Sequence, residues 1–150
     1  MKIEKLDLIK PAIDFLLSEG YSKLYPPQAD CVNAGLLDGK NILVSAPTAS
    51  GKTLTAMLAT ISYLSKNNGK VIYLSPLRAL AAEKFAEFKK LERIELGKKI
   101  KVGISTGDFE NIEKNLEKNN VLILTNEKMD SVIRHSAEWI DEIGLVIVDE

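Results

Sequence analysis

From about residue 40 onward, short apolar runs alternate with longer amphipathic segments. The apolar runs predict five strands, at residues 41–45, 70–74, 101–105, 121–124 and 144–148. Each run is continuous rather than alternating with polar residues. This pattern is typical of a parallel sheet that helices cover on both faces.

The segments between the runs have helical spacing and predict helices at residues 52–66, 78–94, 111–117 and 126–135. Strands that alternate with helices form βαβ units, so the predicted fold class is α/β with a doubly wound parallel sheet. Two further helices precede the sheet. The first has Pro11 in its first turn and Gly20 after its end, and the second runs from about Pro27 to Leu37 and ends at Gly39. We therefore expect one domain over residues 1–150, with a helical region at 1–39 and a sheet core at 40–150.

The composition places few limits on this picture. No apolar run is long enough to span a membrane, and the N-terminus lacks the pattern of a signal peptide. Cys31 is the only cysteine, so we expect an intracellular, cytoplasmic protein in which Cys31 is a small buried core residue.

The charge balance gives no sign of a nucleic-acid partner. The net charge is −1 and the isoelectric point is about 5.9, whereas nucleic-acid binders usually carry a basic excess. The most basic stretch, residues 84–101, is interpreted as a solvated helix face.

The strongest chemical signal is the segment APTASGKT at residues 46–53, between a predicted strand and a predicted helix. Backbone amides at a helix N-terminus bind phosphate oxygens, and Gly51 lets the backbone approach them closely. Lys52 places a positive charge on the β and γ phosphates, and the Thr53 hydroxyl completes a Mg²⁺ shell. Ala46 stands where this phosphate-loop pattern usually has a glycine, which is acceptable if the φ angle of Ala46 is negative.

A second chemical signal is the pair Asp149-Glu150 at the end of the last apolar run. Ligands of α/β sheets bind at the carboxyl ends of the strands. Downstream of a phosphate loop, this pair predicts that Asp149 holds Mg²⁺ through water and that Glu150 orients or deprotonates the attacking water.

Taken in order, the motifs resemble those of the superfamily 2 DExH-box helicases. Within that superfamily the chain is most similar to the Ski-like group, in particular its archaeal 3′–5′ DNA helicases. The motifs that carry the resemblance are LYPPQ at 24–28, PTASGKT at 47–53, SPLRALA at 75–81, STGD at 105–108, TNEK at 125–128 with Asp130-Ser131, and Asp149-Glu150.

The resemblance implies a RecA-like first motor domain that uses ATP and Mg²⁺. It assigns catalysis to Lys52, Asp149 and Glu150, and the metal to Thr53 and Asp149. It assigns contacts with the sugar-phosphate backbone of a nucleic-acid single strand to Arg78, Gly107 and Thr125. It assigns recognition of the adenine edge to Gln28. The implied nucleotide-binding residues are Gln28, Pro47, Thr48, Ala49, Ser50, Gly51, Lys52 and Thr53.

Several of these residues have plainer interpretations. Gln28 is also compatible with an exposed helix start, Ser75-Pro76 with an ordinary strand exit, and Gly107-Asp108 with a plain turn. His135 is expected at the surface or as a helix cap, and Trp139 in the core or at a domain interface.

The leading functional hypothesis is an ATP-dependent helicase that unwinds forked or single-strand-tailed DNA in the 3′–5′ direction, as in repair or replication-fork processing. This chain would be the N-terminal part of its first motor domain. Alternatives are an RNA helicase of the same group, a nucleotide-binding module without hydrolysis and a small-molecule P-loop kinase. The resemblance further implies a second RecA-like domain, and a strand after residue 150 that inserts between the phosphate-loop strand and the Asp-Glu strand. No membrane partner is expected.

Overall fold

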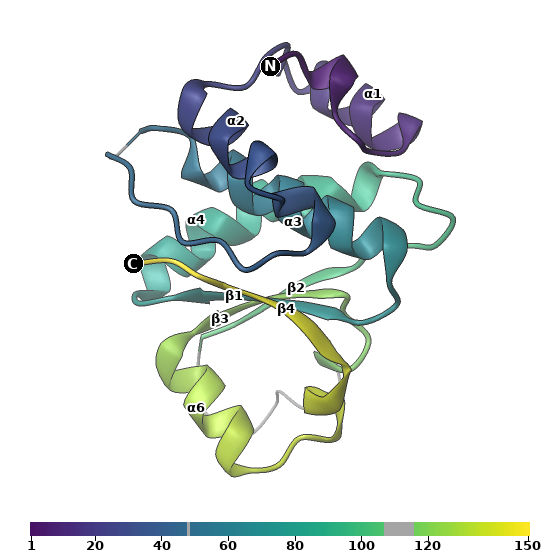
Figure 1. Ribbon diagram of the computed structural model, residues 1–150. Coiled ribbons are helices and arrows are strands. Elements are labelled where there is room, and N and C mark those ends of the chain that lie inside the picture. The colour runs from purple at the N-terminus through teal and green to yellow at the C-terminus, as the bar shows by residue number, and fades with distance from the viewer. Residues whose placement is uncertain (48, 107–115) are drawn as a thin grey trace. The chain divides into compact units, whose positions relative to one another are not determined.

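The structure is a computed structural model that describes residues 1–47, 49–106 and 116–150 (Figure 1). The chain divides into two compact units. The N-terminal unit comprises Met1–Asn67 and Arg93–Lys98, and the sheet unit comprises Asn68–Glu92 and Lys99–Glu150.

The N-terminal unit is helical. Its elements are the 3-10 helices η1 (Ile3–Lys5) and η2 (Leu36–Asp38) and the α-helices α1 (Lys10–Ser18), α2 (Pro26–Asn33) and α3 (Lys52–Lys66). Proline in the first turn of α1 and of α2 fits the fixed φ angle that a helix start requires. The bounds of α3 are those predicted from the spacing of its apolar residues.

The second predicted helix is shorter than expected. It ends at Asn33 rather than near Leu37, because Gly35 adopts a φ of 103° in the left-handed region. An α-helix cannot continue through that conformation, and the chain re-enters a helical turn only as η2. Cys31 is buried on α2, as predicted.

The core of the N-terminal unit forms where α3 contacts α2 and η2. One face of α3 buries Leu54, Leu58, Ile61 and Leu64. The end of α3 is tied to η2 by two hydrogen bonds, since Ser62 Oγ and Lys66 Nζ each donate to the Leu37 carbonyl at 2.8 Å. These bonds satisfy a carbonyl that η2 alone leaves unpaired.

The strand predicted at residues 41–45 is wrong. The structure assigns no strand there, and 97% of the Leu43 surface is exposed. A strand is stabilised by ladder hydrogen bonds to a neighbour, and residues 41–45 pair with none of the four strands of the described sheet. An apolar run therefore does not form a strand when it has no neighbouring strand to pair with.

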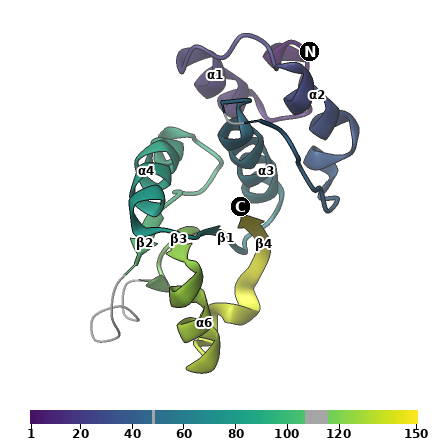
Figure 2. The same ribbon diagram turned by 90° about the vertical axis from the view of Figure 1, so that its left-hand side faces the viewer.

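The sheet unit contains four parallel strands in the order β2-β3-β1-β4. The strands are β1 (Lys70–Ser75), β2 (Val102–Ser105), β3 (Val121–Thr125) and β4 (Ile143–Val148). Helix α4 (Arg78–Lys89) lies on one face of this sheet and α6 (Asn126–Arg134) on the other (Figures 1 and 2). The doubly wound α/β fold class is thereby confirmed.

Burial separates the central strands from the edge strand. All of β3 is buried and β1 nearly so, as their continuous apolar runs predict. In β4 partly buried and exposed residues alternate, and 66% of the Val148 surface is exposed. Among the described residues β4 has β1 as its only strand neighbour. The further strand expected beside β4 stays a prediction.

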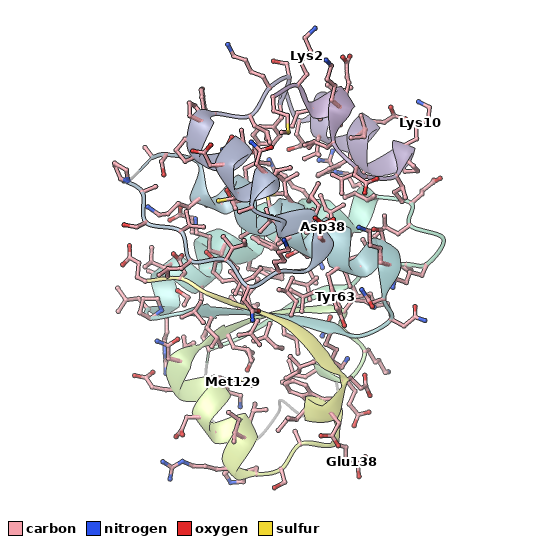
Figure 3. All side chains as sticks on the ribbon, viewed as in Figure 1. Lys2, Lys10, Asp38, Tyr63, Met129 and Glu138 are labelled. Carbon is pink, nitrogen blue, oxygen red and sulfur yellow. The ribbon has the colours of Figure 1, made fainter. Side chains whose placement is uncertain are left out.

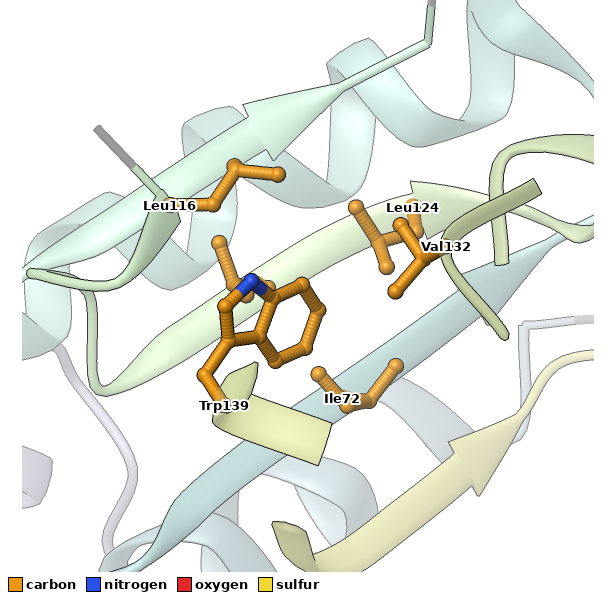
Figure 4. Close-up of a cluster of buried hydrophobic side chains, with 6 residues drawn as sticks. Ile72, Leu116, Leu124, Val132 and Trp139 are labelled. Carbon is orange, nitrogen blue, oxygen red and sulfur yellow. The ribbon is translucent and has the colours of Figure 1, made fainter. Parts of the chain in front are cut away.

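A compact apolar cluster forms on the α6 face of the sheet (Figure 4). Trp139, from the 3-10 helix η5 (Glu138–Glu142), is 3% exposed within it, which confirms a core role. Met129, labelled in Figure 3, packs against the cluster. The buried members are Ile72, Leu116, Leu122, Leu124, Val132 and Trp139.

Most of the basic side chains of residues 84–101 are exposed, as predicted, although the Lys84 side chain is only 12% exposed. Lys84 pairs with Glu87 at 3.3 Å and Lys89 with Glu92 at 2.7 Å.

Helix α4 ends at Lys89 rather than at residue 94, because the chain tightens into the 3-10 helix η3 (Lys90–Arg93). The helix predicted at 111–117 lies largely outside the described residues. Within the described ranges, no helix has the length and apolarity needed to cross a membrane.

We predict that Leu122→Ala lowers the free energy of unfolding by about 2–5 kcal/mol, because it leaves a cavity at a fully buried position in a central strand. Urea unfolding followed by circular dichroism measures the change. Ile133→Ala is the control: Ile133 is 55% exposed, so its loss should cost no more than about 0.5 kcal/mol. Equal costs at the two positions would contradict the described burial.

Candidate nucleotide-binding site

The predicted phosphate loop leads directly into α3, whose first residue is Lys52. Gly51 precedes the helix with a φ of 81°, and Ala49 has a φ of 63°. Ala46 is not among the positive-φ residues, which meets the condition set for alanine at this position. The first turn of a helix presents backbone amides that no intrahelical carbonyl uses, and these favour an anion. Thr48 lies outside the described residues.

The ammonium group of Lys52 lies against the loop that precedes it. Lys52 Nζ donates to the Ala46 carbonyl at 2.8 Å and to the Pro47 carbonyl at 3.1 Å. The charge is thus held at the loop by neutral acceptors. A phosphate oxygen would compete with these carbonyls favourably, because hydrogen bonds between ionised groups are stronger than those to neutral acceptors.

Gln28 connects the start of α2 to the phosphate loop. Its side chain is 2% exposed, so the interpretation as an exposed helix-start residue is wrong. Gln28 Oε1 accepts from the Tyr25 amide at 2.8 Å, and Nε2 donates to the Gly51 carbonyl at 3.1 Å. A Cβ atom on Gly51 would lie 2.0 Å from Gln28 Nε2. Glycine is therefore required at position 51 by both its φ angle and its neighbour.

The Ser50 hydroxyl provides a test of whether the loop suits a polar ligand. Ser50 Oγ is buried and has no hydrogen-bond partner among the described residues. A buried hydroxyl without a partner is unfavourable by about 1–3 kcal/mol. Together with the Lys52 ammonium and the helix start, this hydroxyl fits a phosphate group. Thr53, the second residue of α3, is placed at the same helix start.

The second predicted motif lies at the carboxyl end of β4. The Asp149 amide donates to the Leu74 carbonyl at 3.0 Å, which extends the pairing of β4 with β1. Asp149 Oδ2 accepts from the Tyr73 hydroxyl at 2.7 Å. Glu150 is exposed and has a φ of 64°.

Tyr73 is a residue that the sequence did not single out. Burial raises the pKa of its hydroxyl, and the hydrogen bond to Asp149 and the Asp149 charge raise this pKa further. The hydroxyl therefore stays protonated and remains a donor. Its role depends on the pairing of β1 with β4, and the order of strands in a sheet cannot be read from the chain.

Three predicted motifs meet at one edge of the sheet. Ser75 of β1 pairs in register with Thr125 of β3, and Leu74 of β1 pairs with Val148, next to Asp149. The loops that follow β1, β3 and β4 therefore leave the sheet at the same edge, where α/β proteins bind ligands.

The residues predicted to contact nucleic acid differ in how far their side chains are exposed. Arg78 is exposed at the first position of α4. Thr125 is 2% exposed, and its Oγ1 accepts from the Lys128 amide at 3.3 Å and so caps α6. Gly107 lies outside the described residues.

Two plainer interpretations can be compared with the structure. Ser75 is buried at the strand exit, and its Oγ donates to the Leu77 carbonyl at 3.1 Å. His135 is exposed at the end of α6, and its Nδ1 lies 2.8 Å from the Ser131 carbonyl. The surface or capping position predicted for His135 is confirmed.

Comparison with known proteins identifies relatives along the whole chain. Residues 25–150 match the protein family described as DEAD/DEAH box helicase. Two proteins named ATP-dependent DNA helicase Hel308, from Pyrococcus abyssi and Pyrococcus horikoshii, are 43% and 45% identical over 100% of this chain and 20% of each relative. The chain therefore spans about a fifth of the length of these relatives.

A solved structure also matches. The crystal structure of the DUF1998 helicase MrfA bound to DNA and AMPPNP has a TM-score of 0.79 and 25% sequence identity, covering 95% of this chain and 21% of that chain. These comparisons confirm the sequence-based family resemblance and the fold class.

We predict that Gly51→Ala is more destabilising than Gly39→Ala. Both glycines have positive φ angles, 81° and 78°, so alanine is strained by about 1–2 kcal/mol at each. Only at position 51 would the new Cβ also meet a side chain, Gln28, whereas nothing lies within 4 Å at position 39. Thermal unfolding of the two variants measures the difference.

A double variant identifies why Gly51→Ala destabilises the fold more than Gly39→Ala. In a Gln28→Ala background, Gly51→Ala should cost no more than Gly39→Ala, because the clashing amide is gone. An excess that persists in this background would show that Gln28 does not occupy the described position.

Proposed function

The chain belongs to the DEAD/DEAH box helicase family, and on this premise we propose that it is the ATP-binding part of an ATP-dependent DNA helicase. The observation that carries the proposal is the phosphate loop that opens α3, with Lys52 at the helix start and Gln28 hydrogen-bonded to the Gly51 backbone. This arrangement supports nucleotide binding independently of the names of the relatives.

The proposed nucleotide contacts follow from the chemistry of each group. Lys52 exchanges its two loop carbonyls for the β and γ phosphates, and the Ser50 hydroxyl gains a phosphate partner. Thr53 and Asp149 would hold Mg²⁺, Asp149 through a water molecule, and the ion would supply charge neutralisation at the phosphates. Glu150 would accept a proton from the attacking water. Pro47, Thr48 and Ala49 complete the proposed loop.

Recognition of adenine by Gln28 would require an exchange of hydrogen bonds. Both ends of the Gln28 amide already have partners, the Tyr25 amide and the Gly51 carbonyl. We propose that the adenine edge takes over one of them. This exchange would couple the presence of the base to the backbone of the phosphate loop at Gly51.

DNA is proposed as the partner because two relatives are named DNA helicases and MrfA was crystallised bound to DNA. Arg78, Gly107 and Thr125 would contact the sugar-phosphate backbone of a single strand, without reading base sequence. Thr125 would act through its main chain, since its hydroxyl caps α6. Unwinding in the 3′–5′ direction and a second motor domain elsewhere in the intact enzyme belong to the same proposal.

We predict that Lys52→Ala abolishes binding of Mg-ADP to the chain, because the variant removes the cation that faces the phosphates. Isothermal titration calorimetry measures binding, and circular dichroism checks the fold. Lys23→Ala is the matched control, since Lys23 is an exposed lysine of the same unit and lies outside the proposed site. Binding to Lys52→Ala with wild-type affinity would refute the proposed nucleotide site.

We predict that Arg78→Ala weakens binding of single-stranded DNA to a similar extent for all base sequences. Loss of one phosphate contact should reduce the slope of log affinity against log salt by about 1. Fluorescence anisotropy over a salt series measures both effects. Arg134→Ala is the control, because Arg134 is exposed at the end of α6 and pairs with Asp130 at 2.8 Å.

The same titration with RNA of matching sequence separates the two candidate substrates. Tighter binding of RNA at every salt concentration would replace the proposed DNA helicase by an RNA helicase of the same family. An unchanged salt slope in Arg78→Ala would remove Arg78 from the proposed nucleic-acid interface.

A further inference from the structure

Among the described residues, Tyr73 is the one side chain that donates a hydrogen bond to the Asp149 carboxylate. It lies in β1, where its register partners are Ile123 of β3 and Ile147 of β4. Side chains alternate between the faces of a sheet, so Tyr73, Ile147 and Asp149 share one face. The hydroxyl reaches Asp149 Oδ2 at 2.7 Å along that face.

The ring of Tyr73 is buried and packed against a second aromatic ring. Tyr73 is 3% exposed, and its ring meets the Phe88 ring of α4 edge-on, with a centroid separation of 5.2 Å and an interplanar angle of 63°. Buried aromatic pairs with this geometry stabilise the fold beyond the effect of their burial. The position of the hydroxyl is thus set by a central strand and by the helix packed on it.

Asp149 is held at two points by adjacent residues of β1. The Leu74 carbonyl accepts from the Asp149 amide, which fixes the backbone, and the Tyr73 hydroxyl binds Oδ2, which fixes the rotation of the carboxylate. Among the described residues, no side chain or amide donates to Asp149 Oδ1. One oxygen is therefore occupied by the protein and the other is available.

We propose that Tyr73 is a positioning residue that orients Asp149 so that Oδ1 takes the water shell of the nucleotide-bound divalent cation. This inference rests on the proposed function, because it assigns a role within the same ATP site. Outer partners of this kind restrict a metal-binding carboxylate to one orientation, and their loss typically lowers metal affinity about 10–100-fold.

Packing alone does not account for the hydroxyl. Phenylalanine would fill the same space and keep the contact with Phe88. A hydroxyl at a buried position is unfavourable unless it is hydrogen-bonded, and here its partner is the Asp149 carboxylate. A purely structural hydrogen bond would contribute to folding stability and would have no specific effect on the cation.

The test compares ADP binding with and without Mg²⁺ by isothermal titration calorimetry. The measured quantity is the ratio of the ADP dissociation constant in EDTA to that in saturating Mg²⁺. Tyr73→Phe removes only the hydroxyl, and we expect this ratio to fall about tenfold while the affinity in EDTA is unchanged. Tyr63→Phe is the matched control, since the Tyr63 hydroxyl makes no hydrogen bond among the described residues; it should change neither value (Figure 3).

A double-variant cycle tests whether Tyr73 acts through Asp149. Asp149→Ala should reduce the ratio at least as far as Tyr73→Phe does. Tyr73→Phe in the Asp149→Ala background should then cause no further loss, because the group that it orients is absent. Additive losses would assign the effect of Tyr73 to another part of the site and overturn the inference.

The remaining outcomes separate this inference from the proposed function. An unchanged ratio in Tyr73→Phe, with Mg²⁺-dependent binding in the wild type, would overturn the positioning role and leave the ATP site standing. An equal loss of affinity in EDTA and in Mg²⁺ would indicate a structural role and would also overturn it. No ADP binding by the folded wild-type chain would overturn both proposals.

Discussion

The parallel pairing of β1 with β3 on one side and β4 on the other is the constraint on which the sheet unit depends. Parallel strands place their carboxyl ends at a common edge, so segments that lie far apart in the chain leave the sheet together. The loop leading to Arg78, the cap residue Thr125 and the acid Asp149 all follow from this pairing. A shift of register by one residue would turn Tyr73 to the other face and break its bond to Asp149.

The N-terminal unit has a comparable constraint at the start of α3. The left-handed conformation of Gly51 allows the loop to enter the helix, and the Gln28 amide occupies the space that any larger residue would need. Because Gln28 and Lys52 both bind loop carbonyls, neither polar group is left unpaired. A ligand can then replace the existing hydrogen-bond partners of these groups. This exchange costs less free energy than exposing polar groups that were buried without partners.

The sequence predicted elements whose causes are local. The apolar spacing of α3 and the prolines at the starts of α1 and α2 act within a few residues, and these helices begin where expected. The break at Gly35 was missed because helical spacing continues past it. The run at 41–45 failed as a strand because strand formation depends on a partner elsewhere. The phosphate loop and the Asp149-Glu150 pair were visible as motifs, whereas the burial of Gln28 and the Tyr73 hydrogen bond required knowledge of which segments are neighbours.

The placement of charge reconciles an acidic chain with the proposed nucleic-acid partner. Several lysines of the sheet unit already have acidic partners: Lys84 and Lys89 pair with glutamates, and Lys70 is buried and pairs with Glu142 at 3.7 Å. These side chains stabilise the fold and offer little charge to a polyanion. Arg78 differs, because it is exposed at the positive end of the α4 dipole and at the edge of the sheet where the strands have their carboxyl ends. Binding at such a site relies on a few local contacts rather than on a broad basic surface, so a net charge of −1 does not exclude it.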